Sequence, residues 1–251
     1  ISMFGEDLSF QGGLNYARLF EDSRLWESLL HTVVFTLIAL PIEVFLGYLL
    51  AVLFLEKLPL KQVFVAIILL PTIISPIVAG STWRLMFDQR FGPINQIISW
   101  FAGYEVKLLW TIETAWVWPA ILIAEVWQWT PFMFLLLYAA LSNVDREQLE
   151  AAQIDGASWW MTFRRIVLPA ILPVMFIAIL IRGLDLFRIF DVIWTMTSGG
   201  PGTYTETISI YAYQMAFREF EISYSSAIAF LVIFILTVVI IWLLRRVEVA
   251  R

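Results

Sequence analysis

Long apolar runs alternate with shorter polar stretches along the whole chain. A helix that crosses a bilayer needs about 20 mostly apolar residues. Five segments meet this requirement: roughly 29–55, 62–83, 116–141, 169–196 and 222–244. The sequence therefore predicts an all-α membrane protein with five spanning helices in one domain, residues 29–251, which follows an N-terminal segment, residues 1–28.

Basic residues are distributed unevenly between the polar stretches. Eight lysines and arginines fall within 37 residues of one alternating set: 56–61, 142–165 and 245–251. Six fall within 84 residues of the other set: 1–28, 84–115 and 197–220. Loops on the cytoplasmic side are enriched in Lys and Arg, so the first set and the C-terminus are predicted to be cytoplasmic. Residue 1 then lies outside, and we expect a further spanning helix upstream, with 14–28 along the outer membrane surface.

Composition supports a membrane protein and excludes several classes of site. The 251 residues are 61% hydrophobic and 15% charged, whereas soluble domains have about 25% charged residues. Without cysteine, and with His31 as the single histidine, neither a disulfide framework nor a Cys/His metal cluster can form. The net charge of −5 argues against nucleic-acid binding. The sequence contains neither Gly-x-Ser-x-Gly nor His-Glu-x-x-His, the motifs that would indicate a membrane enzyme.

The polar stretch 142–168 predicts two short helices separated by a turn. Residues 145–154 favour a helix because Asp145 can cap it and Glu, Gln, Leu and Ala propagate it. Gly156 permits a turn that a side chain would resist. A second amphipathic stretch begins at Trp159, and Pro169 fits the start of the next spanning helix. These features alone are equally consistent with an interfacial connector that has no partner.

The same stretch resembles the EAA loop of permease subunits of binding-protein-dependent ABC importers. The residues that match in identity and spacing are Glu150, Ala151, Ala152, Gly156, Ile166, Leu168 and Pro169, and Asp155 and Ala157 also fit the common form. The resemblance implies a type I ABC importer permease fold, in which this loop couples to a cleft of the ATPase subunit. Ala151 and Ala152 would then give a close-packing face, Glu150 a charge for a basic partner residue, and Gly156 the turn.

The resemblance also implies a set of partners. They are two ATP-binding subunits, a second homologous permease subunit, a periplasmic or lipid-anchored solute-binding protein, and membrane lipid. No glycine in the chain is followed by lysine, so a P-loop is absent, and ATP and Mg²⁺ are expected on the partner ATPase, with no cofactor in this chain. The implied location is the bacterial or archaeal plasma membrane.

The outer segment 195–217 points to the solute. Ser198 to Gly202 is expected to be a turn after a helix end. Its Gly199-Gly200-Pro201, with the following threonine, Tyr-x-Tyr and Ala-Phe, is similar to the carbohydrate or maltose-type group of these permeases. The resemblance thus implies import of an oligosaccharide, glycoside or polyol by alternating access. An anionic polyol such as glycerol phosphate remains an alternative, because Arg182 and Arg188 could bind phosphate. A secondary transporter is the alternative from another class.

Polar residues within the apolar segments are candidates for the solute pathway, because they are costly in lipid. Those singled out in segment 116–141, which share a helical face, are Glu125, Gln128, Trp129 and Phe132. Those singled out in segment 169–196 are Arg182, Asp185 and Ile189, also placed on one face. In sugar members of the family the pocket is lined by these two helices. The alternative for Asp185 is a structural pair with Arg182 or Arg188, and Glu43 is expected to be structural.

Overall fold

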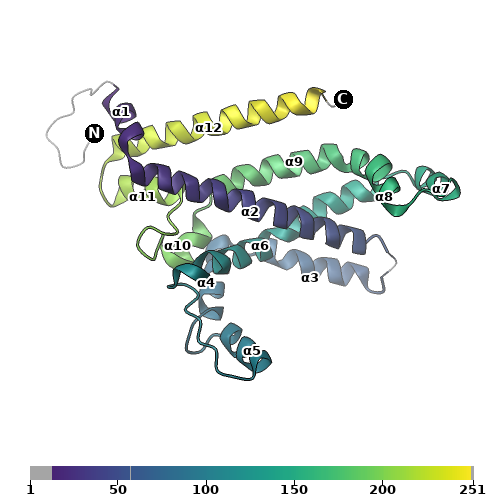
Figure 1. Cartoon of the computed structure of the whole chain (residues 1–251), viewed down its shortest axis with the longest axis horizontal. Coiled ribbons are helices and arrows are strands. Elements are labelled where there is room, and N and C mark those ends of the chain that lie inside the picture. The colour runs from purple at the N-terminus through teal and green to yellow at the C-terminus, as the bar shows by residue number, and fades with distance from the viewer. Residues whose placement is uncertain (1–12, 57, 250–251) are drawn as a thin grey trace. The chain divides into compact units, whose positions relative to one another are not determined.

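The computed structural model describes residues 13–56 and 58–249, and every element within these ranges is a helix (Figure 1). Residues 1–12, Lys57, Ala250 and Arg251 lie outside the described residues. So do the predictions that rest on them, which concern the first part of the 1–28 segment and the basic residues Lys57 and Arg251.

Four helical stretches are long and apolar enough to cross a membrane: Ser23–Leu53, Thr114–Ser142, Trp159–Thr197 and Ile222–Leu243. They correspond to α2 (Ser23–Leu53), α6 (Thr114–Ser142), the run from α8 through α10, and most of α12 (Ile222–Val249). A fifth span is obtained only when a bent pair of shorter helices is counted as one. If that pair is counted as one span, the described residues contain five spans, the number that the sequence predicts.

The bent pair occupies the predicted segment 62–83. Instead of one straight helix it contains α3 (Lys61–Ile73) and α4 (Pro76–Met86), which meet at 96°. Ile74 is extended, with ψ 135°, and α4 begins at Pro76, which has no backbone N–H to donate and fits a first helical position. Apolarity predicted the length of this segment correctly but not its break.

The predicted segment 169–196 also differs from one helix. It contains α9 (Leu168–Phe187) and α10 (Asp191–Thr197), with no helix at residues 188–190. In addition, α9 does not begin anew at Pro169. It continues without a break from α8 (Trp159–Thr162) through a π-helical segment, η1 (Phe163–Val167).

Three short helices lie in stretches that apolarity alone left as loops. They are α1 (Leu14–Glu21), α5 (Pro93–Ala102) and α11 (Ile208–Phe217). The α1 helix lies in the predicted surface segment 14–28, but α2 already begins at Ser23.

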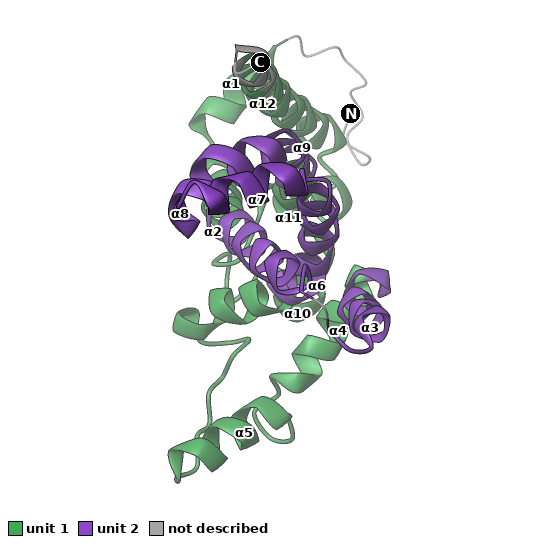
Figure 2. Ribbon diagram, turned by 90° about the vertical axis from the view of Figure 1, so that its right-hand side faces the viewer, with its two compact units in different colours: residues 1–37, 76–124, 184–251 green, residues 38–75, 125–183 purple. Residues whose placement is uncertain are grey.

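The chain divides into two compact units (Figure 2). Unit 1, green in the figure, comprises residues 1–37, 76–124 and 184–251, and unit 2, purple, comprises residues 38–75 and 125–183. Three helices, α2, α6 and α9, contribute residues to both units.

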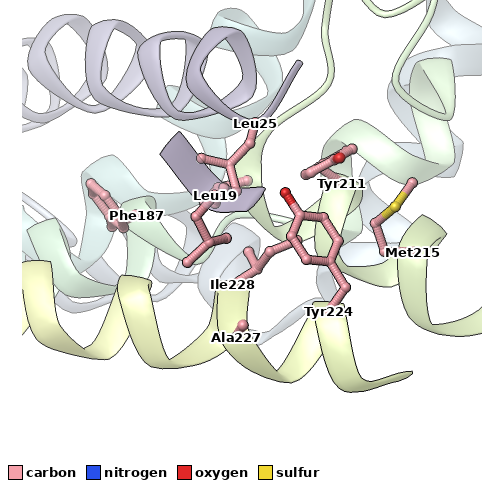
Figure 3. Packing of buried hydrophobic residues seen from close by; sticks show 9 residues of the cluster. Leu19, Leu25, Phe187, Tyr211, Met215, Tyr224, Ala227 and Ile228 are labelled. Carbon is pink, nitrogen blue, oxygen red and sulfur yellow. The ribbon is translucent and has the colours of Figure 1, made fainter. Parts of the chain in front are cut away.

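The core of unit 1 joins α1, α2, α11 and α12 around buried apolar and tyrosine side chains (Figure 3). Leu19 and Leu25 come from α1 and α2, Tyr211 and Met215 from α11, and Tyr224 from α12. Each of these side chains is buried, so the short outer helices are held by packing as well as by hydrogen bonds.

Asp22, between α1 and α2, accepts hydrogen bonds from the hydroxyls of Tyr211 and Tyr224. The backbone N–H of Leu25 also donates to it, at 3.2 Å. Partial burial raises the pKa of the Asp22 carboxyl, but the hydroxyl and backbone N–H donations together outweigh burial, so its pKa lies below the ordinary value. The carboxylate therefore joins three helices in its charged form.

The core of unit 2 is formed where α2 packs on α6 and α9. Buried residues of the three helices, and Phe54 just after α2, meet here; those of the helices are Ala51, Phe134, Leu137, Ala140, Leu141 and Ile171. Gly47 of α2 lies against α6 so closely that an added Cβ would be 2.6 Å from Cβ of Met133. In lipid, small residues of this kind let helix backbones approach.

Candidate solute pathway and subunit-docking loop

Unit 2 contains a buried cluster of three charged side chains from three apolar helices. Arg182 of α9 is 2% exposed, Glu43 of α2 is 0% exposed and Glu125 of α6 is 2% exposed. Arg182 Nε donates to Glu43 Oε2 at 2.7 Å and its Nη2 donates to Glu43 Oε1 at 2.9 Å. The same Nη2 also donates to Glu125 Oε1. We call these three residues the charge triad.

The face of the Arg182 guanidinium is covered as well. Its Cζ lies 4.6 Å from the centre of the Trp129 ring, a distance at which the ring attracts a cation. Arg182 is therefore engaged along its edge by two carboxylates and on its face by an indole. Of the candidate pathway residues, the structure brings Glu125 and Trp129 into contact with Arg182.

Gln128 and Phe132 extend this cluster along α6. Gln128 is buried, and its Nε2 donates to the carbonyl of Ile74 at 3.0 Å, at the break between α3 and α4. Its Oε1 has no hydrogen-bond partner among the described residues. Phe132 is half-buried and meets Trp129 edge to face, with ring centres 6.3 Å apart. Gln128 thus keeps a buried acceptor available, whereas Nε and Nη2 of Arg182 donate to carboxylates.

Asp185 and Ile189 lie in unit 1. They do not form the helical face with Arg182 that the sequence predicts. The α9 helix ends at Phe187, so Ile189, just beyond it, does not continue a helical face with Arg182 and Asp185. Asp185 accepts from Arg188 Nη2 at 2.8 Å, and of the two pairings weighed for Asp185, this is the one that forms. The break at 188–190 is the physical reason why the predicted three-residue face is wrong.

Glu43 is the member of the cluster that sequence reasoning missed. Its sequence position indicates a structural role beside Pro41 but assigns it no partner. The available signal was an acidic residue in one apolar run and a basic residue in another, because an ion in lipid is usually paired. Their separation of 139 positions left the pairing to be found in the fold.

The 142–168 loop forms the predicted helix, turn and second helix. Helix α7 (Arg146–Ile154) begins after Asp145, whose side chain accepts from the backbone N–H of Glu147 at 2.9 Å. Gly156 has φ +72°, a left-handed conformation that favours glycine. The Ser158 side chain then caps α8 by accepting from the Met161 N–H. Caps and turn thus explain this local structure.

The candidate ATPase-docking residues differ in exposure. Glu150, Ala151, Asp155 and Gly156 are exposed, and Pro169 is exposed on α9. Ala152 is buried within the chain, so the close-packing face expected from both alanines reduces to Ala151. Ile166 and Leu168 are half-buried and support the continuous helix. The exposed set is concentrated on α7 and the turn that follows it.

Comparison with known families identifies the chain. Residues 16–249 match the family described as "Binding-protein-dependent transport system inner membrane component". The chain belongs to this family. It is accordingly an inner-membrane permease component with several membrane-spanning helices.

The relatives of this permease include proteins named for sugar transport. It is 39% identical over 204 residues to the trehalose/maltose transport system permease protein MalF of Thermococcus litoralis, which covers 81% of this chain and 68% of that protein. It is 34% identical over 226 residues to the trehalose transport system permease protein SugA of Mycobacterium tuberculosis, covering 90% and 71%. It is 35% identical over 245 residues to a probable ABC transporter permease of Sinorhizobium fredii, covering 96% and 78%.

Solved structures show the same fold. A chain of a bacterial ABC transporter involved in import of the acidic polysaccharide alginate superposes on this permease with a TM-score of 0.82. The two are 22% identical, and the match covers 98% of this chain and 85% of that one. The permease therefore has the type I ABC importer permease fold that the 142–168 loop predicted.

Proposed function

We propose that this permease is the subunit of an ATP-driven importer that translocates an uncharged sugar by alternating access. Several of its relatives are named for trehalose, maltose or lactose transport. The observation that carries the uncharged character of the solute is the pairing of the buried arginine in segment 169–196; the second arginine forms an exposed pair. Arg182 pairs with Glu43 and Glu125, and Arg188 pairs with Asp185.

The pairing of Arg182 argues against an anionic polyol, which is the competing class of solute. A phosphate or sulfonate is recognised through guanidinium donors that are free to form two parallel hydrogen bonds. Arg182 directs its Nε and Nη2 to carboxylates and its face to Trp129. Binding an anion here would require breaking a buried ion pair, which is strongly unfavourable.

Hydrogen-bonding groups beside the charge triad suit a sugar. The buried Gln128 Oε1 can accept from a hydroxyl. Trp127 and Phe132 are at least partly exposed, and such rings can pack against the C–H face of a sugar. We therefore propose that Gln128 and Phe132 contact the solute, with Trp127 beside them.

The exposed residues of the 142–168 loop support a proposal about the partner subunits. We propose that Glu150, Ala151, Asp155 and Gly156 dock on one of two ATP-binding subunits, which bind ATP and Mg²⁺. A second permease subunit and a periplasmic or lipid-anchored solute-binding protein complete the importer. The basic residues of this loop and of the C-terminus favour a cytoplasmic location for both.

Uptake into proteoliposomes tests this function. The complete importer is purified with its partner subunits, reconstituted, and combined with the binding protein. ATP is added on one side of the membrane or the other, and the solute is trehalose, maltose or glycerol 3-phosphate. We expect ATP-dependent uptake of a neutral sugar and little uptake of the phosphate. Preferred uptake of glycerol 3-phosphate would replace the sugar by an anionic polyol, and uptake that needs an ion gradient but no ATP would indicate a secondary transporter.

A further inference from the structure

One uninterrupted helix connects the 142–168 loop to the charge triad. Helices α8, η1 and α9 follow one another from Trp159 to Phe187 without a non-helical residue. Where η1 meets α9, the backbone N–H of Leu168 donates to the carbonyl of Phe163, so the hydrogen-bond ladder persists there. Arg182 lies 23 residues beyond Trp159, or about 35 Å along the axis.

Arg182 is the point at which this helix is fixed to two others. Its two bonds to Glu43 hold it to α2, and its bond to Glu125 holds it to α6. A two-bond fork between guanidinium and carboxylate fixes orientation as well as distance. In lipid, directional bonds of this kind matter more than in water, because apolar surface gives little drive for helices to associate.

The α2 and α6 helices are also held to each other near the triad. Gly47 lies one helical turn after Glu43, and the backbone of α6 at Met133 and Phe134 approaches it closely enough to exclude a side chain. An axial or rotational movement of α9 must therefore carry α2 and α6 with it, or separate buried charges. The second outcome is strongly unfavourable.

We propose that Arg182 is a positioning residue that converts movement of the 142–168 loop into joint movement of α2 and α6, and that it does not bind the solute. This inference rests on the proposed ATP-coupled import. Glu43 and Glu125 are its two attachment points. A rigid connection of this kind makes the opening of the pathway depend on ATP hydrolysis.

The number of solute molecules imported per ATP hydrolysed tests the proposal. The complete importer is reconstituted with Arg182→Lys, which keeps the charge but loses the fork, or with Glu43→Gln. The matched control is Glu27→Gln, on the same α2 helix but exposed. We expect the ratio to fall about tenfold in the first two variants, in the range usual for coupling between sites. ATP hydrolysis per assembled complex should persist, and the control should match wild type.

The outcomes separate this inference from the proposed function. A wild-type importer without ATP-driven uptake contradicts the proposed function itself. A coupled wild type with an unchanged ratio in both triad variants overturns the positioning role. A raised KM for solute at an unchanged ratio would instead make Arg182 a solute ligand. If these variants do not assemble, Glu125→Gln leaves Arg182 and Glu43 in balanced charge, and an unchanged ratio there also overturns the proposal.

Discussion

At the residue scale, Asp22 shows how a single carboxylate holds an outer helix in place. It accepts from Tyr211 of α11 and Tyr224 of α12 while it connects α1 to α2. Its pKa is below the ordinary value, so folding favours the charged form. The stability that this group contributes is complete above the unfolded pKa of about 3.9 and is lost as pH falls through the lower folded pKa.

We expect Asp22→Asn to lower the free energy of unfolding by about 1 kcal/mol at pH 7, because hydrogen bonds to a charged group are replaced by bonds to a neutral amide. For a chain of this size the Tm of the detergent-solubilised protein should fall by about 2–4 °C. The Tm difference from wild type should shrink as pH falls below about 4.

Glu21→Gln is the matched control for this measurement. Glu21 is the neighbouring acidic residue and is exposed, so its Tm should equal that of wild type at pH 7. A difference between Asp22→Asn and wild type that stayed constant down to pH 3 would contradict a role for the Asp22 charge.

At the element scale, close approach of helices gives a second prediction. Gly47→Ala places a Cβ 2.6 Å from Cβ of Met133 and 2.8 Å from the backbone nitrogen of Phe134. The two helices must separate to accept it. We expect the free energy of unfolding to fall by about 1–3 kcal/mol, measured as a lower Tm in detergent.

Gly183→Ala provides the comparison within the same unit. A Cβ there meets only Cδ2 of Leu40, at the ordinary distance of 3.6 Å. Because alanine is the better helix former, this variant should be as stable as wild type or slightly more stable. Equal losses of stability in the two variants would count against close packing at Gly47.

Sequence patterns predicted the spans better than their breaks. Apolarity measures the favourable transfer of a segment into lipid, and this quantity is insensitive to helix continuity. Prolines did not distinguish breaks from continuous helix. Pro41 and Pro173 lie inside continuous helices, whereas Pro76 begins α4 after the 96° bend. The break at residues 188–190 has no proline at all.

The two parts of the candidate site also differ in how well the sequence predicted them. Local signals were sufficient for the 142–168 loop, where Asp145 and Gly156 determine cap and turn within a few residues. The charge triad depends on which helices meet, and Glu43 and Arg182 are 139 positions apart. A helical-face rule could place Glu125 beside Gln128 and Trp129, but it had no means of choosing the partner of Arg182.

At the scale of the whole molecule, the exposed face of α7 is the expected point of contact with an ATPase subunit. We expect Glu150→Lys to reduce the stimulation of ATP hydrolysis by the loaded binding protein about tenfold, because the reversed charge would repel a basic residue of the partner. Glu150→Ala should have a smaller effect. Both variants should keep the wild-type Tm, since Glu150 is exposed.

Glu147→Ala is the control for this interface. Glu147 is exposed on the same helix, and its backbone N–H, not its side chain, forms the cap with Asp145. ATP hydrolysis and uptake should remain at wild-type levels. Full stimulation and full transport in Glu150→Lys would argue against the docking role of α7.

The bend between α3 and α4 has a consequence for the surrounding lipid. The α3 helix has 13 residues, which corresponds to about 20 Å, whereas the hydrocarbon core of a bilayer is about 30 Å thick. After Ile73 the chain turns by 96°, so α4 adds little height in the direction of α3. Beside this pair the bilayer must become thinner or other protein must cover the remaining depth. Where lipid borders this pair, we expect transport by this permease to vary with the thickness of the host membrane.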